Sequence, residues 1–123
     1  MPLYTSITRG SLPDDTKARI AEELTRIHCE VMKVPADFVH VIFLSYPKGF
    51  GYSGGKEAPA TSLNCVLRSG HTVEEKTDLL KQLWLMFQGL TGTPTDQLAI
   101  FLQEIPANNA MGMGQIMQAV GHQ

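Results

Sequence analysis

The chain has 123 residues, of which 43% are hydrophobic and 18% charged, and its formal net charge is −2. This length allows one core, so we predict a single domain over residues 1–123, and the scattered lysines and arginines argue against a nucleic-acid or membrane-surface partner. With no recognisable secretory leader and no apolar segment long enough to span a bilayer, we expect a cytoplasmic protein.

The first predicted element is a strand over residues 3–8, and it follows Pro2 directly. If Met1 is removed, as a small second residue generally permits, Pro2 presents a secondary amine that can hold and release a proton. Such an amine titrates at about 7.7 to 8.0 in model peptides, and an apolar pocket or a nearby cation lowers its pKa toward neutrality, where a general base works best. A chain that keeps Met1 has an amide there and no base. A proline at a frayed terminus without any chemical role is the alternative.

A helix is predicted over residues 14–33, because apolar side chains recur there at helical spacing and charges occupy the other face. Pro35 ends this helix. Residues 39–45 are nearly all apolar and predict a second strand. The Gly-, Lys- and Ser-rich residues 47–59 are interpreted as a linker.

The second half of the chain repeats this pattern. We predict a strand over residues 62–68, a helix that starts with a capping box at residues 72–75, and a strand over residues 98–105. A constant shift along the sequence superposes the two halves without a gap and aligns these pairs: Arg9 with Arg68, Lys17 with Lys76, Leu24 with Leu83, and Pro35 with Pro94. We therefore predict two copies of one β-α-β unit, at about residues 2–55 and 61–114.

Two pseudo-symmetric β-α-β units predict an α/β (α+β) fold, with a four-stranded mixed sheet and two helices on one face. The strand segments 41–44 and 99–102 are apolar on both faces. Because the helices cover only one face, we expect another subunit to cover the other, and hence an obligate oligomer. A monomer with an exposed apolar sheet face would be prone to aggregation.

In such a sheet the first strand runs antiparallel to the third, which predicts that Pro2 lies near Arg68. The end of the first helix brings His28 toward the same place, and His71 follows Arg68 closely. A secondary amine flanked by a guanidinium and imidazoles suits a small anionic carbonyl compound, with Arg68 binding a carboxylate and Pro2 moving a proton. Taken singly, Arg68 is as compatible with a surface ion pair, and each histidine with a solvated helix position.

The sequence shows no metal site. Cys29 and Cys65 are too few and too isolated for a disulfide framework or a zinc site, and the four histidines lack ligand spacing. We expect the two cysteines to be small core residues and the protein to need no cofactor.

Several stretches together resemble the tautomerase superfamily, and within it the cis-chloroacrylate dehalogenase group. The stretches are Pro2, residues 20–23, His28, residues 41–43, residues 67–70 and residues 104–106. The resemblance spans most of the chain and implies a homotrimer without a cofactor. It also implies Pro2 as the catalytic amine, with His28 and Arg68 binding the substrate carboxylate.

The chain departs from that group at three positions. His71 stands where the dehalogenases have a second arginine, Phe101 where they have a tyrosine, and Gly112 where they have a water-activating glutamate. Neither Phe101 nor Gly112 has acid-base capacity, whereas a proton carrier and an anion clamp remain. We therefore predict a keto-enol tautomerase of small 2-oxo acid enols such as phenylenolpyruvate, with Pro2 catalytic and with His28, Arg68, His71 and Phe101 binding substrate. The alternatives are a hydratase or dehalogenase of small unsaturated or halogenated acrylic acids, and a non-catalytic trimeric interaction protein.

Overall fold

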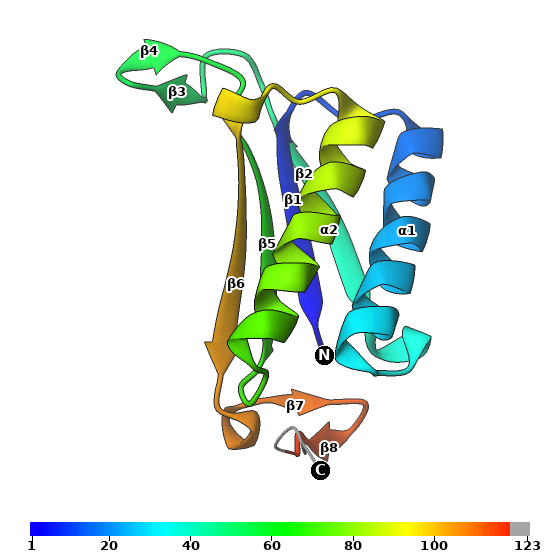
Figure 1. Ribbon diagram of the computed structural model, residues 1–123. Coiled ribbons are helices and arrows are strands. Elements are labelled where there is room, and N and C mark those ends of the chain that lie inside the picture. Colours follow the sequence, from blue (N-terminus) through cyan, green and yellow to red (C-terminus); the bar gives the residue numbers. More distant parts are fainter. Residues whose placement is uncertain (119–123) are drawn as a thin grey trace.

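The computed structural model describes residues 1–118, and two successive β-α-β units make up most of it (Figure 1). The first unit consists of β1 (Leu3–Arg9), α1 (Asp14–Met32) and β2 (His40–Tyr46). The second consists of β5 (Thr61–Arg68), α2 (Val73–Thr91) and β6 (Leu98–Ile105). Short 3₁₀ helices, η1 (Ala36–Phe38) and η2 (Thr95–Gln97), join each helix to the following strand.

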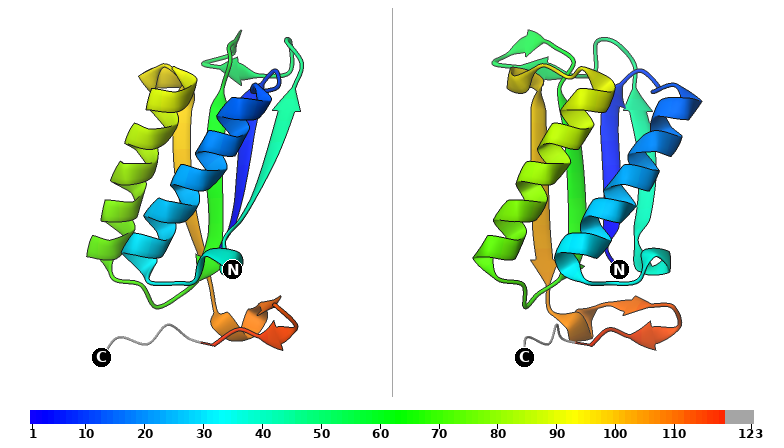
Figure 2. Two further views of the ribbon diagram at one scale, coloured as in Figure 1. Left: turned by 90° about the vertical axis from the view of Figure 1, so that its right-hand side faces the viewer. Right: turned by 45° about the vertical axis from the view of Figure 1, so that its right-hand side comes forward.

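The four long strands form one mixed sheet in the order β2-β1-β5-β6. The pairs β1·β2 and β5·β6 are parallel, and the central pair β1·β5 is antiparallel, with Leu3 opposite Val66 and Ile7 opposite Ser62. Figure 2 shows α1 and α2 packed side by side on the same face of the sheet. This confirms the predicted fold class.

The core lies between the helices and the sheet. Side chains alternate across a strand, so every second residue of β1 and β5 points toward the helices. The buried apolar residues, all at most 2% exposed, are Tyr4, Ile20, Leu24, Ile27, Leu63, Cys65, Leu67, Leu79, Leu83 and Phe87. Burial of each large aliphatic side chain stabilises the fold by roughly 1.5 to 3 kcal/mol. The expectation that both cysteines are core residues is confirmed for Cys65 and is wrong for Cys29, which is only partly buried.

Both helices have defined ends. Thr72 forms the predicted capping box: its hydroxyl oxygen accepts from the Glu75 backbone N–H at 3.1 Å, and its own N–H donates to the Glu75 carboxylate at 2.8 Å. The helices close on left-handed residues, Lys33 (φ 58°) and Gly92 (φ 68°). Each is followed two residues later by a proline, which cannot extend the helix.

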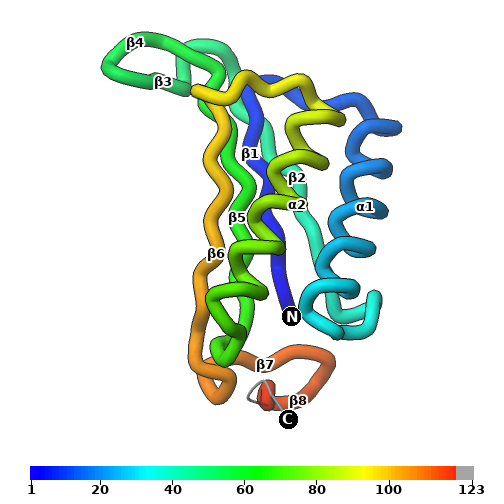
Figure 3. Tube along the Cα trace, in the orientation of Figure 1, coloured from blue at the N-terminus to red at the C-terminus, as the bar shows by residue number. Residues whose placement is uncertain are grey.

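The predicted linker over residues 47–59 is not a simple linker, and in this respect the sequence interpretation was wrong. It contains a hairpin of β3 (Tyr52–Ser53) and β4 (Lys56–Glu57), joined by Gly54 and Gly55, which both have positive φ. Two such residues between short strands are the signature of a tight hairpin turn. A matching hairpin, β7 (Met111–Gly112) and β8 (Gln115–Ile116), follows η3 (Ala107–Asn109). The tube in Figure 3 shows the two hairpins at opposite ends of the sheet, with β7–β8 beside the amino terminus.

Among residues 1–118, no helix covers the second face of the sheet. Large apolar side chains on this open face remain about half exposed: Ile42 (49%), Leu44 (51%) and Phe101 (54%). Within residues 1–118, neither helix is long and apolar enough to cross a membrane. The same residues contain no cluster of His, Cys, Asp and Glu side chains that could hold a metal ion.

Candidate active site at the amino terminus

Pro2 directly precedes β1 at one end of the sheet, and its side chain is less than 2% exposed. The Pro2 carbonyl accepts a hydrogen bond from the His40 backbone N–H at 3.0 Å, which continues the pairing of β1 with β2 by one residue. Because side chains alternate along the strand, Pro2 shares the helix-facing side of β1 with Tyr4. The position of Pro2 is therefore fixed by the sheet rather than by a loose terminus.

The amino group of the chain is partly buried and is flanked by two other elements. The antiparallel register, continued beyond Leu3, sets Met1 opposite Arg68. A Cβ added to Gly112 would lie 4.0 Å from the Met1 nitrogen and 3.5 Å from Met1 Cγ, so β7 packs directly on the terminus. Burial lowers the pKa of the Met1 amino group, and the Arg68 charge lowers it further. An amine held here is thus biased toward its neutral form, which is the form that accepts a proton.

His28 reaches the same region from the last turns of α1. It is 1% exposed, and its Nδ1 lies 2.7 Å from the Tyr4 hydroxyl oxygen. Burial lowers the pKa of His28 to about 4, and the nearby His71 and amino terminus act in the same direction. At neutral pH the imidazole is therefore uncharged.

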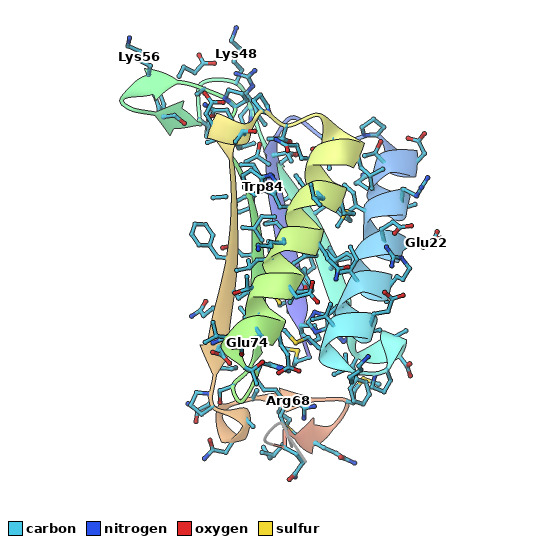
Figure 4. The ribbon with its side chains drawn as sticks, in the orientation of Figure 1. Glu22, Lys48, Lys56, Arg68, Glu74 and Trp84 are labelled. Atoms are coloured by element: carbon cyan, nitrogen blue, oxygen red, sulfur yellow. The ribbon has the colours of Figure 1, made fainter. Side chains whose placement is uncertain are left out.

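Arg68 ends β5, and its side chain belongs to the open face of the sheet. Its Nη1 donates a hydrogen bond to the backbone carbonyl of Gln118 at 2.7 Å. Figure 4 shows Arg68 at the end of the sheet nearest the β7–β8 hairpin, while Lys48 and Lys56 lie at the far end. The side chains of Pro2 and Arg68 therefore lie at the same end of the sheet but on opposite faces.

His71 lies in the turn between β5 and α2, and Glu104 of β6 organises this turn. The Glu104 carboxylate forms an ion pair with Lys76 at 2.8 Å and accepts from the backbone N–H groups of Gly70 and His71. The hydrogen bond from Lys76 is the main reason that the pKa of Glu104 is lowered. This carboxylate fixes the backbone that carries His71, a role that the sequence interpretation did not anticipate.

A small cavity adjoins the terminus. It has a volume of about 110 Å³ and is bounded by Arg68, by Phe38, and by side chains of the β7–β8 hairpin and residues 117–118. A larger hollow of about 470 Å³ lies between the outer surfaces of α1 and α2, but both arginines there are paired: Arg19 with Glu23, and Arg26 with Glu23 and Glu30. We place the candidate site at the smaller cavity, because Arg68 lines it and Gly112, another of its lining residues, packs against the amino terminus.

Phe101 is not part of this cluster. It lies on the open face of β6, opposite Asn64, and is 54% exposed. Four sequence-derived candidates, Pro2, His28, Arg68 and His71, are thus gathered around one amino terminus, and the fifth points away from the protomer. Tyr4, which the sequence interpretation missed, could have been found from its position two residues after Pro2 on the same strand.

Comparisons with known proteins bear on the family and the fold of the chain. Residues 1–117 match the family described as "Putative oxalocrotonate tautomerase enzyme". The chain is 28% identical to N1, described as a member of the cis-3-chloroacrylic acid dehalogenase family; the match covers 97% of this chain and 85% of that one, with a TM-score of 0.91.

Two further solved structures share the fold at lower identity. Pt0534, described as inactivated by 2-oxo-3-pentynoate, is 21% identical over 94% of each chain, with a TM-score of 0.85. A fused 4-OT described as a symmetric trimer is 19% identical over 94% of each chain, also with a TM-score of 0.85. No curated protein sequence matches significantly. The family match over nearly the whole chain and the similarity of fold show that this protein belongs to the tautomerase superfamily.

Proposed function

We propose that the protein is a keto-enol tautomerase of small 2-oxo acid enols, with Pro2 as the proton carrier. The observation that supports this most is the partly buried amino terminus, where burial and Arg68 lower the pKa of the Met1 amine. Removal of Met1 would move the amine by one residue, a shift of about 3.8 Å along the chain, to the buried nitrogen of Pro2. It would then lie beside His28, which is uncharged at neutral pH.

The proposed reaction needs only a proton transfer. The neutral Pro2 nitrogen takes the proton of the enol hydroxyl, and the resulting cation donates a proton to C3, so that the enol becomes the 2-oxo acid. Arg68 binds the substrate carboxylate through two parallel N–H donors, in place of the Gln118 carbonyl that it contacts in this structure. His28 and His71 donate hydrogen bonds to substrate oxygens.

The direct test is ketonisation of phenylenolpyruvate by protein whose Met1 has been removed. We expect Arg68→Ala to raise KM by about 10- to 100-fold, since a hydrogen-bonded charge contributes about 1.5 to 3 kcal/mol. Arg9→Ala is the matched control, because Arg9 stands at the corresponding end of β1 and pairs with Glu57 at 3.3 Å. An inactive wild type, or equal kinetics for Arg68→Ala and Arg9→Ala, would contradict the proposal.

A hydratase or dehalogenase is the second candidate, and the similarity to N1 favours it. Adding water to an acrylate requires an activated water, but Gly112, which packs against the amino terminus, has no side chain to do this. We expect no chloride release from cis-3-chloroacrylate and no hydration of propynoate. Product formation from either compound would favour the second candidate. Retention of Met1 in cells would instead favour a non-catalytic protein.

We propose that the open sheet face, with Ile42, Leu44 and Phe101, is covered by other copies in a homotrimer. Phe101 would then reach the site of a neighbouring protomer.

Light scattering is expected to give the mass of three chains. Ile42→Asp should lower that mass, because it places a charge in the buried contact. Leu85→Asp, on the helix side and 72% exposed, should not. A monomeric wild type would refute the trimer.

The cytoplasmic location expected from the sequence stays a prediction.

A further inference from the structure

Tyr4 and His28 form a buried hydrogen-bonded pair next to the proposed site. Their side chains, 0% and 1% exposed, join β1 to α1 through the 2.7 Å contact between Tyr4 Oη and His28 Nδ1. The two rings meet edge to face, with centroids 5.5 Å apart and an interplanar angle of 88°. Since neither side chain is open to solvent, water does not compete for this hydrogen bond.

The direction of the bond follows from the protonation states of the groups around it. Burial raises the pKa of Tyr4, so the phenol keeps its proton, and the His28 pKa of about 4 leaves the imidazole with one proton at neutral pH. Cys65 lies directly opposite Tyr4 on β5. Burial raises the pKa of this thiol to about 12, so Cys65 is protonated as well.

Two arrangements of the Tyr4–His28 hydrogen bond are possible. In one, the Tyr4 O–H donates to His28 Nδ1. In the other, His28 Nδ1–H donates to Tyr4, and the Tyr4 O–H has only the sulfur as acceptor. Sulfur is a weak acceptor, whereas a neutral imidazole nitrogen is a good one. The first arrangement pairs the strong phenol donor with the strong acceptor and is therefore favoured.

We propose that Tyr4 is a positioning residue that donates to His28 Nδ1 and so holds His28 in the neutral tautomer with its proton on Nε2. This inference rests on the proposed function for its catalytic consequence. The groups that act on the His28 ring besides Tyr4 are His71 and the amino terminus. Because Tyr4 occupies Nδ1, Nε2 is the ring nitrogen available to the proposed site. There it would donate a hydrogen bond to a substrate oxygen without adding a charge. The negative charge of the substrate would then be matched by Arg68.

The test is the tautomer of His28, read from long-range proton–nitrogen correlation spectra of protein labelled with ¹⁵N at histidine. A His28→Asn variant assigns the signals among the four histidines. We expect the wild type to show His28 protonated at Nε2 only. Tyr4→Phe should populate the Nδ1–H form and raise KM about tenfold with a smaller change in kcat. Tyr46→Phe is the control, because the Tyr46 hydroxyl donates to Ala60 at the other end of the sheet.

The spectrum does not depend on activity, so it separates this inference from the proposed function. A wild-type His28 protonated at Nδ1 would overturn the inference even if Tyr4→Phe fails to fold. An unchanged tautomer and unchanged KM in a folded Tyr4→Phe variant would overturn it as well. An Nε2–H tautomer in a protein without ketonisation activity would keep the positioning role and remove the tautomerase.

Discussion

Pro2→Ala is expected to lower kcat/KM for phenylenolpyruvate ketonisation by about 10²-fold or more, since general acid-base catalysis by a positioned group contributes about 10²- to 10⁴-fold. Alanine keeps an amino group, but it loses the ring that fixes the nitrogen at the buried end of β1. Its primary amine is also more mobile and better hydrated. The loss should therefore appear in kcat.

The matched control for this prediction is Pro47→Ala. Pro47 is exposed in the loop that follows β2, at the opposite end of the sheet from Pro2. It should keep wild-type kinetics. A second preparation that retains Met1 should be inactive, because its Pro2 nitrogen is an amide. Equal rates for Pro2→Ala and the wild type would remove Pro2 from the mechanism.

The second large effect concerns stability in acid. Between pH 6.5 and about 4, we expect the free energy of unfolding to fall by about 3 kcal/mol because of His28 alone. Above pH 6.5 His28 is neutral in both states and makes no difference. Between the two pKa values the unfolded chain binds a proton that the buried ring of the folded protein does not. Stability is therefore lost as pH falls and stops changing, for this group, below about pH 4.

The measurement is urea unfolding at several pH values in this window, at constant protomer concentration. Glu104, whose pKa is lowered in the folded protein, also loses stabilisation in acid, so the difference between wild type and His28→Gln isolates the histidine. His28→Gln should show a flatter dependence on pH, and His40→Gln, at an exposed position on the sheet edge, should follow the wild type. Identical slopes for wild type and His28→Gln would refute the buried neutral histidine.

Much of the fold was predictable because the signals are local. Ile20, Leu24 and Ile27 recur at helical spacing and all lie in the core, and the last strand runs over residues 98–105 as predicted. The antiparallel arrangement of the first and third strands also brought Pro2 and Arg68 to one end of the sheet. The division into repeat units of residues 2–55 and 61–114 stays a prediction about the origin of this pattern.

The details of the site were less predictable, because they depend on which face of a strand each side chain occupies and on contacts between distant segments. Arg68 and Pro2 lie on opposite faces of the sheet, and Arg68 contacts Gln118, far along the chain. The Tyr4–His28 hydrogen bond joins two residues whose types alone suggest no pairing. The β3–β4 hairpin was missed although its Gly-Gly turn is visible in the sequence.

The most direct test of the account is titration of the amino-terminal nitrogen, monitored by ¹⁵N NMR of proline-labelled protein. The intact mass of the sample must first show that Met1 is absent. We predict that Pro2 titrates below the 7.7 to 8.0 range of an unperturbed terminal amine, and that Arg68→Ala raises this pKa. A Pro2 pKa within or above that range, or a mass that includes Met1 in protein isolated from its native cells, would contradict the account.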